Sequence, residues 1–273
     1  VETSDKTTIH VIKDSTSDAV VTIPTGRYID LQLDGHTYEL TAGTNVSTNV
    51  FMVNGQLDIT GGTVKSKAKA GILNVESGGI LNITGGTYQA TGSRQVLYNK
   101  GSTATISGDA ILTSTSAERA TVHNLENGTT YILGGTIKST GTLSTAIATQ
   151  NKSHAVVNES GTVYIGEQGG TPSTTSPIIQ GGTSGVFGSN VYFYDGIIKG
   201  YGASFGTVPD SSKIESGYEI IDDNETISGT NYHTAILGQN ANTYVITLDP
   251  NGGEVTPTAL VVNQGDDLTG LHN

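Results

Sequence analysis

The chain has 273 residues, of which 37 are glycine, none is cysteine or tryptophan, and only 34% are hydrophobic. The absence of cysteine excludes disulfide bonds, thiolate metal sites and a cysteine nucleophile. A formal net charge of −12 without any basic run argues against nucleic-acid binding, which needs clustered Lys and Arg. No run of about 18 apolar residues is present, so the sequence predicts no membrane insertion.

The segment Val20–Leu40 is predicted to form short strands separated by turns. Its residues, VVTIPTGRYIDLQLDGHTYEL, combine a Pro-x-Gly turn with a Leu-x-Leu-x-Gly-His-Thr strand. This pattern resembles the opening coils of secreted bacterial parallel β-helix proteins. The resemblance implies a right-handed parallel β-helix. It leaves the activity open, because that fold carries pectin lyases, glycoside hydrolases, tailspikes and adhesins alike.

A repeated phrase follows, in which an apolar residue, any residue, Ile and any residue precede Gly-Gly-Thr. It occurs as LDITGGTV, LNITGGTY, ATISGDAI and TYILGGTI, with weaker copies in VYIGEQGGTP and YFYDGII. The intervals between the first glycines are 24, 23, 26 and 35 residues, from positions Gly61, Gly85, Gly108, Gly134 and Gly169. Because apolar and polar residues alternate within each phrase, the repeat predicts an all-β solenoid with about 23–26 residues and three short strands per coil. We assign residues 1–215 to this domain.

Asparagines recur beside the predicted strands. Asn54, Asn99, Asn124 and Asn158 each follow an apolar-rich run and precede a glycine, whereas Glu76 breaks the series. Asparagine tolerates a left-handed backbone, and stacked amides hydrogen-bond from one coil to the next. The spacing therefore predicts an asparagine ladder at one corner of the solenoid.

Residues 216–238 contain two strand-like runs, Tyr218 to Asp222 and Tyr232 to Leu237, on either side of a polar region. This pattern predicts a β-hairpin that caps the open end of the solenoid. The acidic run 222–225 lacks the glycine and the spacing of a calcium-binding loop, so we interpret it as a solvated hairpin turn.

The last segment, 239–273, has a separate resemblance. Residues Thr243 to Leu271, with the turn Asp249-Pro250-Asn251-Gly252-Gly253, are similar to the first half of the internalin B-type repeat, also called the Listeria–Bacteroides repeat. The acidic pair Asp266 and Asp267 falls where the loop after its second strand would be. The resemblance implies a partial β-grasp-like module of the kind found on surface proteins, without the aromatic second half.

Aligning the repeats on their Ile and Gly-Gly positions places one residue of each repeat in an outward-facing column: Asp58, Asn82, Thr105, Tyr131, Tyr164 and Tyr192. Tyr194 lies beside the tyrosine end. Exposed aromatic rings pack against the apolar face of a sugar or against a protein partner, so Tyr131, Tyr164, Tyr192 and Tyr194 are the candidate ligand-binding residues. The alternative is that the loop Glu167 to Ser184 folds over these rings and buries them.

A second column holds Lys65, Gln89, Leu112, Lys138 and Lys199, which we interpret as solvated positions. The acids Asp58, Asp109 and Asp195 are isolated in the alignment, although a glycosidase needs a carboxylate pair. Arg94 and Arg119 stand alone, and the six histidines lack metal-ligand spacing. We therefore expect no catalytic residue, no metal and no cofactor.

These features favour a non-catalytic, adhesin-like module on the surface of a bacterium or secreted from it, as a monomer within a larger modular chain. The expected partner is a glycan or a host surface protein. A polysaccharide-degrading enzyme on the same fold and a passive stalk are the alternatives.

Overall fold

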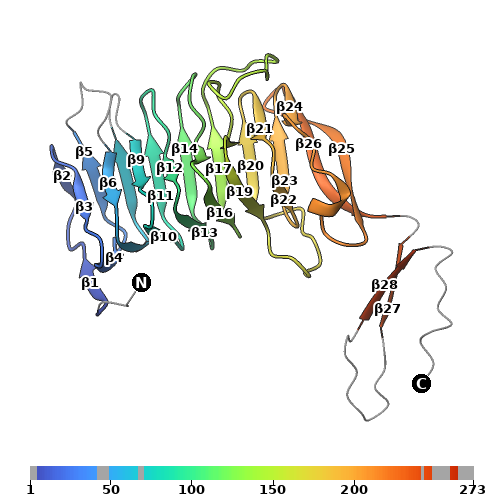
Figure 1. The fold of residues 1–273 in the computed structure, drawn as a ribbon. Coiled ribbons are helices and arrows are strands. Elements are labelled where there is room, and N and C mark those ends of the chain that lie inside the picture. The colour runs from blue at the N-terminus through green and yellow to red at the C-terminus, as the bar shows by residue number, and fades with distance from the viewer. Residues whose placement is uncertain (1–4, 42–48, 67–70, 241–242, 248–258, 264–273) are drawn as a thin grey trace, which may run out of the picture.

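The computed structural model describes residues 5–41, 49–66, 71–240, 243–247 and 259–263. Within these ranges strands form nearly all of the regular structure, and the single helical element is the short 3₁₀ helix η1 (Ser211–Lys213). Strands β1 to β24 build three parallel sheets along a common axis (Figure 1). The chain makes about seven turns between the first and the last strand of each sheet, which confirms the predicted parallel β-helix.

Each coil contributes one strand to each sheet, and we name the sheets A, B and C. Sheet A contains β1 (Thr7–His10), β4 (Tyr28–Gln32), β7 (Gln56–Thr60), β10 (Ile80–Ile83), β13 (Thr103–Ile106), β16 (Gly128–Ile132), β19 (Gly161–Ile165) and β22 (Val191–Phe193). Sheet B contains β2 (Ser15–Ser17), β5 (Thr37–Leu40), β8 (Thr63–Ser66), β11 (Thr87–Ala90), β14 (Ile111–Ser114), β17 (Thr136–Ser139), β20 (Ile178–Gly181) and β23 (Ile197–Gly200). Sheet C contains β3 (Val21–Ile23), β6 (Asn49–Val53), β9 (Gly71–Val75), β12 (Leu97–Lys100), β15 (Val122–Leu125), β18 (Val156–Asn158), β21 (Ser184–Gly188) and β24 (Ala203–Phe205).

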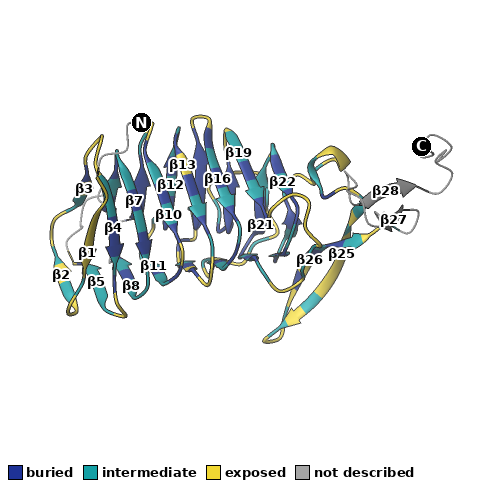
Figure 2. Cartoon of the chain, turned by 90° about the horizontal axis from the view of Figure 1, so that it is seen from below, coloured by how far each residue is buried: buried dark blue, intermediate teal, exposed yellow. Residues whose placement is uncertain are grey.

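The core consists of side chains that return to the same place in every coil. The isoleucine of the repeated phrase forms an inward-facing column of sheet A, and its buried members pair in register: Leu31, Ile59, Ile83, Ile106, Ile132, Ile165 and Phe193. In most strands of sheets A and B, buried residues alternate with partly exposed ones, whereas β9, β15 and β18 of sheet C are buried along their whole length. Figure 2 colours the strands by burial. The repeat thus encodes the fold directly, because one apolar residue in two is enough to fill a narrow interior.

An asparagine ladder lies in sheet C, with three of the four predicted members. Asn99 donates to the side-chain oxygen of Asn124 over 2.9 Å, and Asn124 donates to that of Asn158 over 2.8 Å. All three side chains are buried. Asn54 is not a member, because Val53 and Val75 occupy the ladder position in the preceding coils. Asn54 stands one residue later, and a shift of one residue moves a side chain to another face.

The predicted hairpin is present and consists of β25 (Tyr218–Ile227) and β26 (Thr230–Gln239), with β26 pairing antiparallel to β23. Its turn is Ser228-Gly229, where both residues have positive φ, as in a type I′ turn. The interpretation of 222–225 as a turn is wrong, because these residues lie within β25. Their acids instead anchor the hairpin to the solenoid: Glu225 pairs with Lys199 at 2.6 Å, and Asp222 accepts from Ser204.

The segment with the internalin-type resemblance contributes a separate two-stranded sheet, in which β27 (Thr243–Thr247) pairs antiparallel with β28 (Ala259–Asn263). The residues of the predicted turn, 249–253, and the acidic pair Asp266 and Asp267 lie outside the described residues. In the described part of the chain, no helix has the length and hydropathy needed to span a membrane.

Candidate functional site

The predicted outward column exists on sheet A, with every member in the expected register. Asp58 pairs with Asn82, Asn82 with Thr105, and Thr105 with Tyr131. Tyr131 then pairs with Tyr164, and Tyr164 with Tyr192. Residues between 23 and 33 positions apart in sequence are therefore direct neighbours, separated by the strand spacing of about 4.8 Å.

The three tyrosines, hereafter the tyrosine stack, lie ring upon ring. The ring centroids of Tyr131 and Tyr164 are 5.0 Å apart with planes inclined by 10°, and those of Tyr164 and Tyr192 are 4.8 Å apart with planes inclined by 22°. Neighbouring ring faces are thus turned toward each other along the solenoid axis. The ring edges and hydroxyl groups point away from the sheet, so the surface of the stack differs from a flat platform of ring faces.

The stack keeps part of its surface open to solvent, since Tyr131, Tyr164 and Tyr192 are all half-buried. Burial between two rings raises the pKa of the Tyr164 hydroxyl. Tyr194, the fourth candidate, is only 6% exposed, and its ring lies tilted against that of Tyr192 at 6.0 Å. Tyr194 therefore supports the end of the stack from below the surface, where a ligand has little access to it.

The loop that was expected as a possible cover is fixed to the last coil. The amide of Gly169 donates to the carboxylate of Glu215 over 2.9 Å, and the amide of Ser173 donates to that of Asp195. Glu215 is 6% exposed. Asp195 thus fixes the loop that contains Ser173. With this loop in place the rings of the stack remain half-exposed, so the loop does not bury them.

The same column is acidic at its N-terminal end, and here the sequence alignment missed a residue. Asp30 pairs in register with Asp58, which places two carboxylates on neighbouring coils. Lys6 forms an ion pair with Asp30 at 2.8 Å, and Asn82 donates to Asp58 over 2.7 Å. The hydrogen bond from Lys6 lowers the pKa of Asp30, so this carboxyl group stays ionised at neutral pH. A glycosidase also requires a carboxyl group with a raised pKa as its proton donor, and Asp30 has the opposite shift.

The second outward column, on sheet B, differs from the prediction at Leu112, and it also contains Gln180 between Lys138 and Lys199. Thr113, and not Leu112, pairs with Gln89 and Lys138, while Leu112 is fully buried. Four residues separate β13 from β14, whereas three separate β10 from β11. The longer turn shifts the next strand by one residue and exchanges its two faces.

A buried serine–histidine pair lies elsewhere, at the start of β21. Nδ1 of His154 is 2.7 Å from Oγ of Ser184, and Nε2 is 2.9 Å from the carbonyl oxygen of Thr149. Both side chains have no exposed surface, and the imidazole stacks on Phe187 at 4.8 Å. With no access for a substrate, the pair fastens the loop before β18 to the solenoid.

Burial also predicts how stability depends on pH, because desolvation lowers the pKa of His154 below its ordinary 6.5. Well above pH 6.5 the imidazole is neutral in both the folded and the unfolded chain. As the pH falls through 6.5, the imidazole of the unfolded chain takes up a proton that the folded chain excludes, so the free energy of unfolding falls. We expect the variant His154→Gln to show a shallower fall than the wild type between pH 7 and 5 in urea unfolding. Equal slopes in the two proteins would contradict this assignment.

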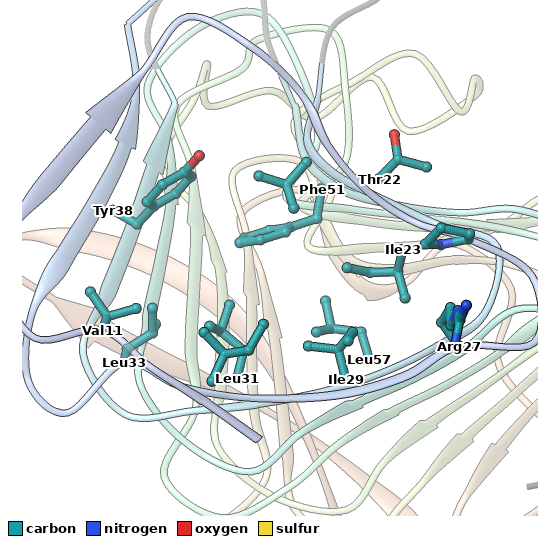
Figure 3. A pocket seen from close by; sticks show the side chains of 13 residues that line it. Val11, Thr22, Ile23, Arg27, Ile29, Leu31, Leu33, Tyr38, Phe51 and Leu57 are labelled. Carbon is teal, nitrogen blue, oxygen red and sulfur yellow. The ribbon is translucent and has the colours of Figure 1, made fainter. Parts of the chain in front are cut away.

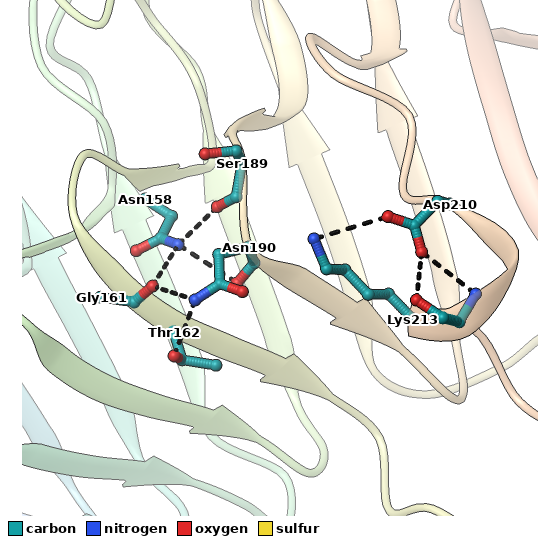
Figure 4. Close-up of polar contacts among 8 residues, drawn as sticks. Asn158, Gly161, Thr162, Ser189, Asn190, Asp210 and Lys213 are labelled. Carbon is teal, nitrogen blue, oxygen red and sulfur yellow. Dashed lines mark hydrogen bonds and ion pairs between the residues drawn. The ribbon is translucent and has the colours of Figure 1, made fainter.

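Cavities lie toward both ends of the described solenoid. The larger, about 350 Å³, lies inside the first coils and is lined almost wholly by apolar side chains, including Val11, Ile29 and Phe51 (Figure 3). The smaller, about 110 Å³, lies beside the end of the asparagine ladder (Figure 4). There Asn158 donates to the carbonyl of Ser189, and Asn190 to that of Gly161, so the amide donors are already engaged.

In the part of the chain that the structure describes, no three His, Cys, Asp or Glu side chains come together as they would at a metal site. The chain matches no family model, no curated protein and no solved structure at a significant level. Conclusions about function therefore depend on the geometry of the column on sheet A.

Proposed function

We propose that this chain is a non-catalytic, adhesin-like binding module of a bacterial surface or secreted protein, and that its tyrosine stack contacts a neutral glycan. One observation carries the proposal: three tyrosines occupy the same position of successive coils, stack on each other and remain half-exposed. Such a surface presents aromatic carbon and hydroxyl groups at regular intervals, which suits a ligand that is itself a repeating, partly apolar polyol.

The charge of the column favours a neutral ligand. Asp30 and Asp58 lie in the same column, beyond Thr105 and Asn82, and the whole chain carries a net charge of −12. A polymer of uronic acids would meet like charges along this face, whereas a neutral glycan would meet hydrogen-bond acceptors. The surface location draws on the resemblance of Thr243–Leu271 to the internalin-type repeat and of Val20–Leu40 to secreted β-helix proteins.

The test is binding of the full chain to immobilised oligosaccharides. We expect binding to at least one of cellohexaose, chitohexaose and mannohexaose, and none to polygalacturonate. The triple variant Tyr131→Ala, Tyr164→Ala, Tyr192→Ala is expected to lose this binding. Tyr98→Ala, which removes a half-exposed tyrosine on sheet C, is the matched control and should bind like the wild type.

Two outcomes would overturn the proposal. If no glycan binds while a panel of extracellular matrix proteins does, the partner is a protein. If the triple variant binds glycans as well as the wild type, the tyrosine stack is not the site.

A glycoside hydrolase is the second candidate, because Asp30 and Asp58 lie on neighbouring coils. Their backbones are about 4.8 Å apart, close to the carboxylate separation of retaining enzymes. The lowered pKa of Asp30 and the engagement of both carboxylates by neighbouring side chains weigh against it. Release of reducing sugar from the oligosaccharides above, abolished by Asp58→Asn, would establish this alternative.

A further inference from the structure

We infer that the ring face of Tyr131 that is turned away from Tyr164 is the sugar-stacking surface of the module, with Thr105 and Asn82 as the floor in front of it. This inference rests on the proposed function and specifies where the sugar lies. It follows from the way the rings are arranged.

Within the tyrosine stack, neighbouring rings cover each other's faces. Both faces of Tyr164 are covered, by Tyr131 on one side and by Tyr192 on the other. The ring of Tyr192 also has the ring of Tyr194 beside it, with the centroids 6.0 Å apart and the planes inclined by 40°, and Ile214 pairs with Phe193 on the same strand. The C-terminal end of the stack is therefore flanked by other residues of the chain.

The N-terminal end of the stack is different, because the next position of the column is Thr105. A threonine side chain is much shorter than a phenol ring, so the outer part of the Tyr131 ring rises above it. The surface has a step at this point, with an aromatic wall and a polar floor. Beyond Thr105 the floor continues with Asn82 and Asp58, both half-buried.

The groups that form the wall and the floor of this surface step fit a pyranose ring. The wall offers a flat π-face for the axial C–H groups of a sugar, and the floor offers hydrogen-bonding groups for its equatorial hydroxyls. Asn82 donates its amide N–H to Asp58, which directs the amide and leaves its carbonyl oxygen as an acceptor. A β-linked sugar with all substituents equatorial matches both surfaces at once.

The experiment uses the full chain, cellohexaose as the probe, and calorimetry together with saturation-transfer NMR. Tyr131→Ala is expected to weaken binding about tenfold. Tyr131→Phe keeps the ring face and should stay within about twofold of the wild type. Tyr192→Ala, from the other end of the same stack, should weaken binding clearly less than Tyr131→Ala does. Tyr98→Ala on sheet C is the matched control and should stay within about twofold of the wild type. Magnetisation should pass from the Tyr131 ring to the sugar C–H protons.

The outcomes separate this inference from the proposed function. If wild-type protein binds neither cellohexaose nor any glycan of the panel, both fail. If it binds and Tyr131→Ala and Tyr192→Ala weaken binding equally, the ligand spans the ring edges and the step is not the subsite. If Tyr131→Phe weakens binding as much as Tyr131→Ala, the hydroxyl group and not the ring face makes the contact, which also overturns the inference. Unfolding curves of each variant confirm that the solenoid is intact.

Discussion

Replacing Asn124 with alanine is expected to lower the free energy of unfolding by about 3 to 4 kcal/mol. Its side chain lies at the centre of the asparagine ladder with no exposed surface. It accepts from Asn99 and Thr130, and it donates to Asn158 and to the carbonyl of Gly128. Alanine leaves several of these buried groups without a partner, and each such group destabilises the fold by about 1–3 kcal/mol.

Urea unfolding followed by circular dichroism measures the effect. The control is Asn151→Ala, which removes an exposed asparagine that accepts from the side chain of Arg119, and which should change stability by less than about 0.5 kcal/mol. A loss below about 1 kcal/mol for Asn124→Ala would show that the ladder contributes little, because water or neighbouring groups then replace its bonds.

Replacing Gly188 with alanine is expected to destabilise the solenoid by at least about 3 kcal/mol. Gly188 follows the ladder in register with Asn158 and has φ of +111°, where side chains are rarely tolerated. A Cβ atom there would lie 2.0 Å from the carbonyl oxygen of Asn158, which belongs to the backbone of the neighbouring coil. The coils would have to move apart to accommodate it.

The matched control for this change is Gly170→Ala. The nearest atom to a Cβ at Gly170 is 3.8 Å away, and its backbone does not adopt the left-handed region. We expect Gly170→Ala to change the free energy of unfolding by less than about 1 kcal/mol. The thermal unfolding midpoint of Gly188→Ala should therefore lie clearly below that of Gly170→Ala. Similar midpoints for Gly188→Ala and Gly170→Ala would mean that adjacent coils yield easily at this corner.

The sequence was sufficient to predict the fold and the tyrosine column because the solenoid repeats its register. Once Ile59, Ile83 and Ile106 are recognised as equivalent, the residue before each of them points outward by alternation. The same argument extends to Tyr131, Tyr164 and Tyr192, and their pairing confirms it.

The errors arise where the repeat changes length or has no signature. The repeat alignment placed Leu112 instead of Thr113 on the outer face, because the turn before β14 has four residues and its sequence, Ser-Gly-Asp-Ala, gives no sign of the added residue. Asp30 was missed as a neighbour of Asp58 because its coil lacks the Gly-Gly-Thr phrase. The orientation of the tyrosine rings could not be predicted from the sequence either, because packing between coils decides whether a ring exposes its face or its edge.

The apolar cavity at the N-terminal end makes the two ends of the solenoid unequal. At the other end, β26 is hydrogen-bonded to β23, and Leu237 joins the core. Near the cavity, Ile9 is 44% exposed, and among the described strands β1, β2 and β3 each have a hydrogen-bonded neighbour on one side only. In a linear array each coil depends on its neighbours. The tyrosine stack lies in the coils next to the hairpin, where the ion pair of Lys199 with Glu225 joins the hairpin to β23, so a ligand bound to the stack rests on coils that are braced by the hairpin.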